Sequence, residues 1–130
     1  MSDLKPKVLL VEDDPFMATL LSGELIKSGF EVATAADGED AITRFKALRP
    51  DVMIFDILLP KKNGIEALRE IRALPGGEKV PTVVLSNLEE SEYVSEAQKL
   101  GVKSYLIKAN VQLPEIVAKV RGALREGQNG

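Results

Sequence analysis

The sequence predicts a single α/β domain built on a parallel β-sheet with helices on both of its faces. Three observations support this prediction. Five short runs rich in Val, Ile, Leu or aromatic residues recur along the chain, as is typical of strands buried on both faces of a parallel sheet. Helix-like stretches separate these runs, and such alternation favours parallel strands joined by right-handed crossovers. The length of 130 residues suits one compact domain with its own core.

The predicted strands are short and apolar. They cover residues 7–11, 30–35, 51–55, 81–85 and 104–107. The predicted helices cover residues 15–28, 37–48, 64–74, 89–100 and 113–124. Gly29 and Gly101 directly follow two of these helices, as is typical of helix C-termini. An all-helical bundle is the alternative, but DVMIF and PTVVL are too short and too rich in β-branched or aromatic residues for helices. We expect residues 1–125 to form the domain and residues 126–130 a polar tail.

The composition excludes several kinds of chemistry. The chain contains no cysteine and no histidine, which excludes disulfides, thiolate nucleophiles, imidazole bases and imidazole metal ligands. Any metal ion must therefore be bound by oxygen, which favours Mg²⁺ or Ca²⁺. The net charge of −3 indicates no general nucleic-acid-binding or membrane-binding surface. No targeting segment or transmembrane-length apolar stretch is visible, and we expect a cytoplasmic protein.

Polar side chains follow four of the five predicted strands at the point where each strand ends. They are Glu12, Asp13 and Asp14 after the first strand, Asp56 after the third, Ser86 after the fourth and Lys108 after the fifth. The carboxyl ends of parallel strands share one edge of the sheet, where ligands bind in open α/β folds, so these side chains converge. Clustered carboxylates raise one another's pKa values unless a cation neutralises them. Carboxylates, a hard metal ion and a lysine together suit transfer of a phosphoryl group onto an aspartate.

These residues also have purely structural interpretations. Asp13 and Asp14 could cap the following helix, because an aspartate before a proline such as Pro15 is a common helix start, and capping is compatible with metal binding. Asp56 could be an ordinary loop residue, and Lys108 a solvated lysine. The functional interpretation prevails because unrelated loop residues would not recur at four of five strand ends along one edge.

The chain resembles the receiver domains of two-component response regulators. The resemblance rests on the motifs VEDD, FDILLPKKNG, LSN and YLIK, which occur in the order and at the separations usual for the family and span residues 7–124. It implies a flavodoxin-like fold with the strand order 2-1-3-4-5 of chemotaxis receivers. It also implies a phosphorylation-activated signalling protein rather than an enzyme, which at most catalyses its own phosphorylation and dephosphorylation.

The resemblance implies a phosphoacceptor and a metal site. Asp56 is expected to accept the phosphoryl group. Mg²⁺ is expected to bind Asp14 directly, with Asp13 assisting directly or through water, and to bind Asp56 and the backbone carbonyl of Leu58. Haloacid dehalogenase-like phosphatases also use an aspartate nucleophile with Mg²⁺, but they need a second aspartate where this chain has Leu58.

The resemblance also implies a switch. The Ser86 hydroxyl is expected to meet the phosphoryl group after activation, Tyr105 to turn inward behind it, and Lys108 to pair with the phosphoryl oxygens. Many receivers continue after this lysine with a proline in a cis peptide, whereas this chain has Ala109. Because a cis peptide before any other residue costs about 3 kcal/mol or more, the Lys108–Ala109 peptide is either trans with an altered loop or cis under strain.

The expected partners are proteins, with no direct nucleic-acid or membrane contact. A sensor histidine kinase or a phosphotransfer protein must supply the phosphoryl group, because this chain has no histidine. A downstream protein is expected to bind the face formed by helix 89–100, strand 104–107 and helix 113–124. Only six residues follow Leu124, which favours a stand-alone receiver. The alternatives are a receiver that docks partners without phosphorylation and a receiver cut from a longer regulator.

Overall fold

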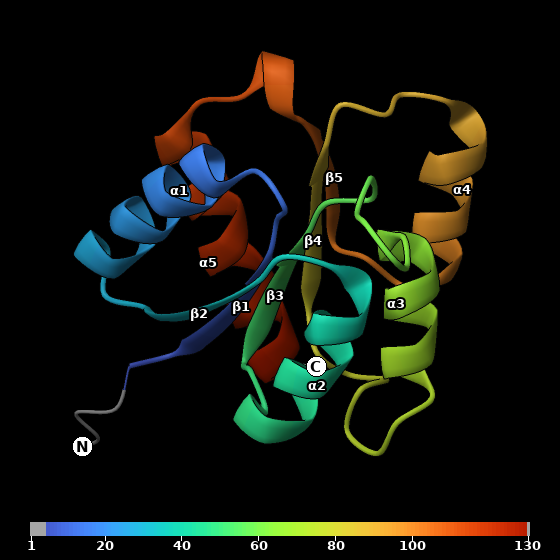
Figure 1. The fold of residues 1–130 in the computed structure, drawn as a ribbon. Coiled ribbons are helices and arrows are strands. Elements are labelled where there is room, and N and C mark those ends of the chain that lie inside the picture. Colours follow the sequence, from blue (N-terminus) through green and yellow to red (C-terminus); the bar gives the residue numbers. More distant parts are fainter. Residues whose placement is uncertain (1–4, 130) are drawn as a thin grey trace.

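The structure, a computed structural model, describes residues 5–129 and contains a five-stranded parallel sheet between two layers of helices (Figure 1). The strands are β1 (Lys7–Val11), β2 (Glu31–Ala35), β3 (Val52–Phe55), β4 (Thr82–Ser86) and β5 (Ser104–Ile107). The helices are α1 (Pro15–Lys27), α2 (Gly38–Leu48), α3 (Gly64–Arg72), α4 (Ser91–Lys99), the 3-10 turn η1 (Lys108–Asn110) and α5 (Leu113–Asn129). The strand order is β2-β1-β3-β4-β5 with parallel pairing throughout. The predicted fold class and the strand order implied by the resemblance are confirmed.

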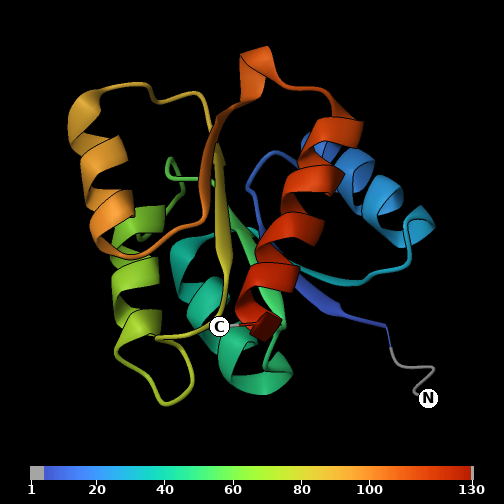
Figure 2. The same cartoon turned by 180° about the vertical axis from the view of Figure 1, so that it is seen from behind.

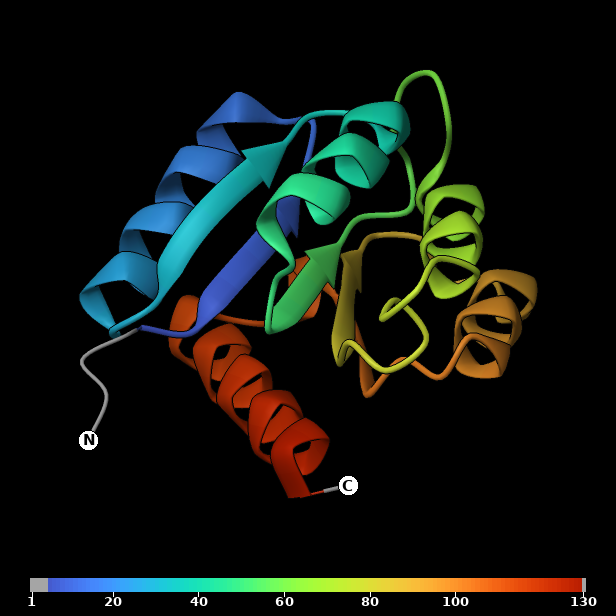
Figure 3. The ribbon, with the colours of Figure 1, turned by 90° about the horizontal axis from the view of Figure 1, so that it is seen from below.

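Helices cover both faces of the sheet, as Figures 2 and 3 show from behind and from below. One buried cluster contains Leu21 of α1 and Val120 of α5. A second cluster, on the other face, contains Phe45 of α2. Successive residues of a strand point to opposite faces, and in β1 Leu10 joins the first cluster while Leu9 joins the second. Burial on both faces is therefore the reason that the strands are uninterrupted apolar runs.

The helix boundaries follow local signals, and several differ from the prediction. α1 ends at Lys27, α2 begins at Gly38 and α4 covers Ser91–Lys99, each one or two residues inside the predicted bounds. α3 begins with a capping box between Asn63 and Glu66, but it ends at Arg72, two residues before the predicted end. α5 continues to Asn129, so the predicted tail is helical up to that residue, while Gly130 lies outside the described residues. The division of the chain at residue 125 stays a prediction. None of the helices within residues 5–129 has the length and apolar composition needed to cross a bilayer.

Candidate functional site

Three carboxylates meet at the carboxyl edge of the sheet. One oxygen atom from each of Glu12, Asp13 and Asp56 lies within 4.8 Å of the other two. Glu12 and Asp56 are buried, whereas Asp13 is exposed. Carboxylates this close repel one another unless a cation lies among them. An oxygen-only ligand set of this kind fits a hard divalent ion such as Mg²⁺.

Backbone hydrogen bonds of the sheet hold two of these acids in place. The N–H of Glu12 donates to the carbonyl of Ala35 at 2.9 Å, and the N–H of Asp56 donates to the carbonyl of Val11 at 3.0 Å. Both residues thus continue the ladder one step beyond their strands. Their side chains therefore start from a rigid backbone although the two residues are distant in sequence.

The carboxylate of Asp14 makes the helix-capping contact that the sequence also indicates. Its Oδ1 accepts the N–H of Phe16 at 3.0 Å and caps α1 in front of Pro15. The three carboxylates of the cluster include Glu12, to which the motif assigned no role, and do not include Asp14. An aspartate before a proline at the first helical position is well placed to serve the first turn of the helix. The metal role of Asp14 stays a prediction.

Both carboxylate oxygens of Asp56 have hydrogen-bond partners. Oδ1 accepts the N–H groups of Ile57 at 2.7 Å and Leu58 at 3.3 Å, while Oδ2 lies 2.6 Å from Nζ of Lys108. The backbone of Asp56 is also closely packed, because a Cβ atom at Gly64 would lie 2.1 Å from the Asp56 carbonyl oxygen. Glycine at this position lets α3 begin directly against the Asp56 backbone. The Asp56 side chain is therefore held in one orientation.

Lys108 neutralises part of the cluster. Its side chain is only 15% exposed, and Nζ lies 2.6 Å from Asp56 Oδ2 and 2.8 Å from Glu12 Oε1. Burial alone lowers the pKa of Lys108, but the hydrogen bonds and charges of Asp56 and Glu12 outweigh burial and raise the pKa above its ordinary value of 10.5. Lys108 is therefore positively charged at neutral pH.

Burial has the larger effect on Glu12. It raises the pKa of the Glu12 carboxyl above its ordinary value of 4.5, although Lys108 and the N–H of Asp14 lower that pKa in part. A raised pKa means that the folded protein binds this proton more tightly than the unfolded chain does. The stabilisation from this proton is complete below pH 4.5 and is lost as the pH rises through the folded-state pKa of Glu12.

A Glu12→Gln variant tests this linkage, because glutamine keeps the shape of the side chain but does not titrate. We expect the free energy of unfolding of the wild type, relative to the variant, to fall as the pH rises from about 4.5 towards neutrality. Urea unfolding followed by circular dichroism in the presence of a chelator measures this difference. If the free energy of unfolding of the wild type relative to the variant stays constant or increases over this pH range, the pKa of Glu12 is not raised in the folded protein.

Ser86 and Tyr105 meet at the backbone of Leu88. Ser86 is buried at the end of β4, and its Oγ accepts the N–H of Leu88 at 3.3 Å. The half-buried Tyr105 of β5 donates its hydroxyl to the Leu88 carbonyl at 2.7 Å. Burial, with smaller effects from Glu90 and Asp56, raises the pKa of Tyr105 above 10.0. The phenol therefore stays protonated at neutral pH and remains a hydrogen-bond donor.

The loop after β5 differs from the family pattern in its hydrogen bonding. The Lys108–Ala109 peptide is trans, because residues 5–129 contain no cis peptide bond, and Lys108–Asn110 forms one 3-10 turn. The first of the two arrangements left open by the sequence is therefore found. The N–H of Ala109 donates to Oδ1 of Asn87 at 3.0 Å. A proline at position 109 has no N–H to donate. The motif LSN does not reveal this contact, because nothing in the local sequence indicates which distant N–H an asparagine accepts.

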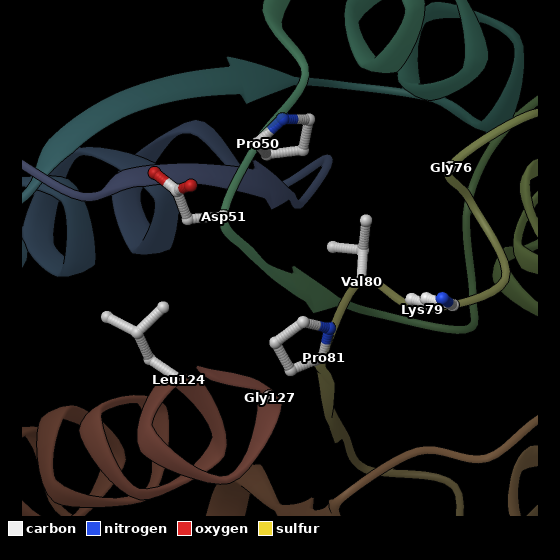
Figure 4. A pocket seen from close by; sticks show the side chains of 8 residues that line it. All are labelled: Pro50, Asp51, Gly76, Lys79, Val80, Pro81, Leu124 and Gly127. Carbon is white, nitrogen blue, oxygen red and sulfur yellow. The ribbon is translucent and has the colours of Figure 1, made fainter. Parts of the chain in front are cut away.

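A pocket of about 250 Å³ lies at the opposite edge of the sheet (Figure 4). Its lining includes Asp51, Pro81 and Leu124. Asp51 precedes β3, whereas Asp56 follows it, so the pocket and the carboxylate cluster lie at opposite ends of that strand. This pocket therefore does not coincide with the residues that carry the chemistry.

Known proteins with similar sequences are response regulators. The family model of the response regulator receiver domain matches residues 8–121. The DNA-binding response regulator MtrA of Mycolicibacterium smegmatis is 35% identical over 129 residues, which are 99% of this chain and 55% of MtrA. The chemotaxis protein CheY of Thermotoga maritima is 37% identical over 103 residues, which are 78% of this chain and 84% of CheY. The chain thus spans about half the length of the MtrA relatives that it matches.

Solved structures support the same assignment. Chemotaxis protein CheY4 of Vibrio cholerae superimposes with a TM-score of 0.86 at 27% identity, covering 92% of this chain and 99% of CheY4. Receiver domains are signalling domains rather than classical enzymes, they interact with histidine kinases or phosphotransfer proteins, and they generally bind Mg²⁺ in an acidic pocket. Glu12, Asp13 and Asp56 form an acidic cluster of this kind. The chain therefore belongs to the response regulator receiver domains of two-component signalling systems.

Proposed function

We propose that this receiver is a phosphorylation-activated switch and that Asp56 is its phosphoacceptor. One observation carries the proposal: Asp56 is a buried carboxylate that contacts Lys108 and lies beside two further carboxylates. This arrangement supplies a nucleophile, a fixed positive charge and the ligands for a metal ion at one point. These are the groups that transfer of a phosphoryl group to a carboxylate requires.

Carboxylate oxygens of Glu12, Asp13 and Asp56 would hold Mg²⁺, with the Leu58 carbonyl as a further ligand implied by the family resemblance. We place Glu12 in the role that the sequence suggested for Asp14, because the Asp14 carboxylate caps α1. The exposed Asp13 would bind the ion directly or through water. When bound, the ion neutralises the repulsion among the carboxylates and part of the charge of the phosphoryl oxygens.

In the proposed transfer, a carboxylate oxygen of Asp56 forms a bond to the phosphorus atom of the donor. The bond from phosphorus to the donor breaks, and its electron pair stays with the donor. Lys108, which now contacts Oδ2 of Asp56, would pair with the phosphoryl oxygens. The chain contains no histidine, so a donor histidine lies outside these 130 residues, and we propose that a histidine kinase or a phosphotransfer protein supplies it. Docking of such a protein is supported by the apolar side chain of Phe16, which is 74% exposed at the start of α1.

The switch would act through Ser86 and Tyr105. When the Ser86 hydroxyl turns to the phosphoryl group, it gives up the N–H of Leu88, and Tyr105 moves with the Leu88 carbonyl that it binds. The adjoining helix α4 is loosely held: Ala97 is its one buried residue, and no side chain caps its N-terminus. We therefore propose that phosphorylation shifts a pre-existing equilibrium at the face formed by α4, β5 and α5, where a downstream protein binds.

We further propose a stand-alone receiver in residues 1–125, with no direct contact to nucleic acid or membrane. The match to 84% of the length of Thermotoga maritima CheY supports this proposal. The match to 55% of MtrA favours the alternative of a receiver within a longer regulator. The mass of the protein isolated from its own cells separates the two, because a stand-alone receiver has a mass of 14.1 kDa.

Incubation with Mg²⁺ and the small phosphodonor acetyl phosphate tests the proposed function. We expect intact-mass spectrometry to detect a single added phosphoryl group. A chelator should slow its formation by at least about tenfold, because the ion offsets charge in the transition state, and added Mg²⁺ should restore the rate. The alternative function, a receiver that docks partners without phosphorylation, gives no Mg²⁺-dependent adduct, and this result would overturn the proposal.

A further inference from the structure

The loops that carry Ser86 and Lys108 are joined by one side chain. Strands β4 and β5 pair as far as Ser86 opposite Ile107. Beyond this pair the two chains enter different loops, and Oδ1 of Asn87 accepts the N–H of Ala109 across the gap at 3.0 Å. The contact thus extends the connection between β4 and β5 by one step, through a side chain instead of the backbone.

This hydrogen bond restrains a turn that has no buried residue. The turn η1 spans three residues, none of which is buried. Its first residue, Lys108, is held at Nζ by Asp56 and Glu12, and the next residue is held at its N–H by Asn87. Lys108 is therefore held at Nζ, and the residue that follows it is held at its backbone N–H. Together these contacts limit the directions in which Nζ can move.

The same contact restrains the loop after β4. Asn87 follows Ser86, and the next carbonyl, that of Leu88, accepts the hydroxyl of Tyr105. Two consecutive residues of this loop are therefore bound from the side of β5. A movement of the Ser86 backbone towards Asp56 would also move the adjoining Asn87 and so would act on the Ala109 N–H.

We infer that Asn87 is a positioning residue that couples the Ser86 loop to Lys108 by accepting the N–H of Ala109. The inference rests on the proposed function, since it concerns the lysine that pairs with the phosphoryl group. It needs a residue other than proline at position 109. The departure from the lysine–proline pattern of many receivers thus has a specific consequence in this chain: it supplies the N–H that Asn87 binds.

Asn87→Leu tests the coupling, because leucine has nearly the same shape as asparagine but no acceptor. Asn110→Leu is the matched control, since it makes the same change at an exposed asparagine of the neighbouring turn. We expect Asn87→Leu to slow Mg²⁺-dependent phosphorylation by acetyl phosphate about fivefold. This is the ratio of rates that corresponds to the net free energy of one hydrogen bond. Asn110→Leu should leave the rate unchanged, and Asn87→Asp, which keeps an acceptor oxygen, should recover part of the loss.

A double-mutant cycle separates coupling from a general disturbance of the loop. Ala109→Pro removes the N–H and also disfavours the helical conformation of Lys108, so it lowers the rate by itself. In the Ala109→Pro background, Asn87→Leu should have no further effect. An equal effect of Asn87→Leu in both backgrounds, or no recovery with Asn87→Asp, would overturn the inference.

A second measurement keeps this inference distinct from the proposed function. Hydrogen exchange of the Ala109 amide, followed by NMR, does not depend on phosphorylation. We expect exchange about tenfold faster in Asn87→Leu than in the wild type, because the N–H loses its acceptor. If the wild type takes up no phosphoryl group, the proposed function fails. If it does, but Asn87→Leu exchanges and reacts like the wild type, the coupling fails.

Discussion

Asp56→Asn is expected to abolish phosphoryl uptake from acetyl phosphate, lowering its rate at least about a hundredfold, as loss of a nucleophile does. The amide of asparagine is not a nucleophile towards phosphorus at neutral pH. The change also removes a negative charge from the cluster formed with Glu12 and Asp13, which weakens Mg²⁺ binding. Intact-mass spectrometry of wild type and variant under identical conditions measures both amounts of adduct.

Asp51→Asn provides the control for this prediction. Asp51 lies just before β3 and Asp56 just after it, so both changes neutralise one aspartate at an end of the same strand. Asp51 is exposed, and its Oδ2 accepts the N–H of Lys7 at 2.8 Å. We expect Asp51→Asn to be phosphorylated like the wild type. Equal phosphorylation of Asp56→Asn would show that the nucleophile is a different residue.

The Asp56→Asn variant is also expected to remain folded. Asparagine keeps an Oδ1 acceptor for the N–H groups of Ile57 and Leu58, and Lys108 keeps its contact with Glu12. One of three mutually repelling carboxylates is removed, which offsets the loss of the contact with Lys108. Urea unfolding should therefore differ from that of the wild type by no more than about 1 kcal/mol. This result excludes misfolding as the reason for lost phosphorylation.

Arg72→Met is expected to cause a large loss of stability, about 3 kcal/mol. The partly buried guanidinium donates to the carbonyls of Leu100, Gly77 and Val80, each at 2.8 Å, and to Oγ1 of Thr82 at 3.1 Å. It thereby joins α3 to the loop before β4 and to the end of α4. Methionine fills similar space but leaves three carbonyls without this donor, at about 1 kcal/mol for each lost hydrogen bond.

Arg69→Met in the same helix is the matched control. Arg69 is exposed and makes an ion pair with Glu96 at 2.6 Å, and such a pair contributes less than about 1 kcal/mol. Burial lowers the pKa of Arg72 below its ordinary value, but the guanidinium remains charged at neutral pH. The midpoint of thermal unfolding should fall by about 10 °C for Arg72→Met and by only a few degrees for Arg69→Met. Equal shifts would mean that the Arg72 contacts do not stabilise the fold.

Part of the site was predictable because it depends on strand ends. A strand buried on both faces is a continuous apolar run, and the first polar residue after it marks the carboxyl edge of the sheet. Asp56, Ser86 and Lys108 were identified in this way. In the structure Asp56 contacts Lys108, and Ser86 is the last residue of β4. Their roles in phosphorylation remain predictions for the experiments described above.

Which of the neighbouring carboxylates joins the cluster was not predictable, because each of them is chemically able to bind a metal ion or a lysine. Glu12 and Asp14 both carry carboxylates beside the same strand end, but the ladder bond of Glu12 to β2 directs it to the cluster, while Pro15 leaves Asp14 to cap α1. Orientation of this kind arises only when the sheet and the helix are both in place.

The α/β fold, the strand ends and the absence of imidazole chemistry could be predicted from the sequence, because apolar periodicity and residue type are local properties of the chain. Only the packing of the folded chain shows that Asn87 accepts the N–H of Ala109 and that Arg72 binds carbonyls of two separate segments, the loop before β4 and the end of α4. Each of these contacts joins residues whose distance depends on the packing of several elements. No local pattern encodes such a distance, since side-chain donors and acceptors bind whichever partner the fold brings within about 3 Å.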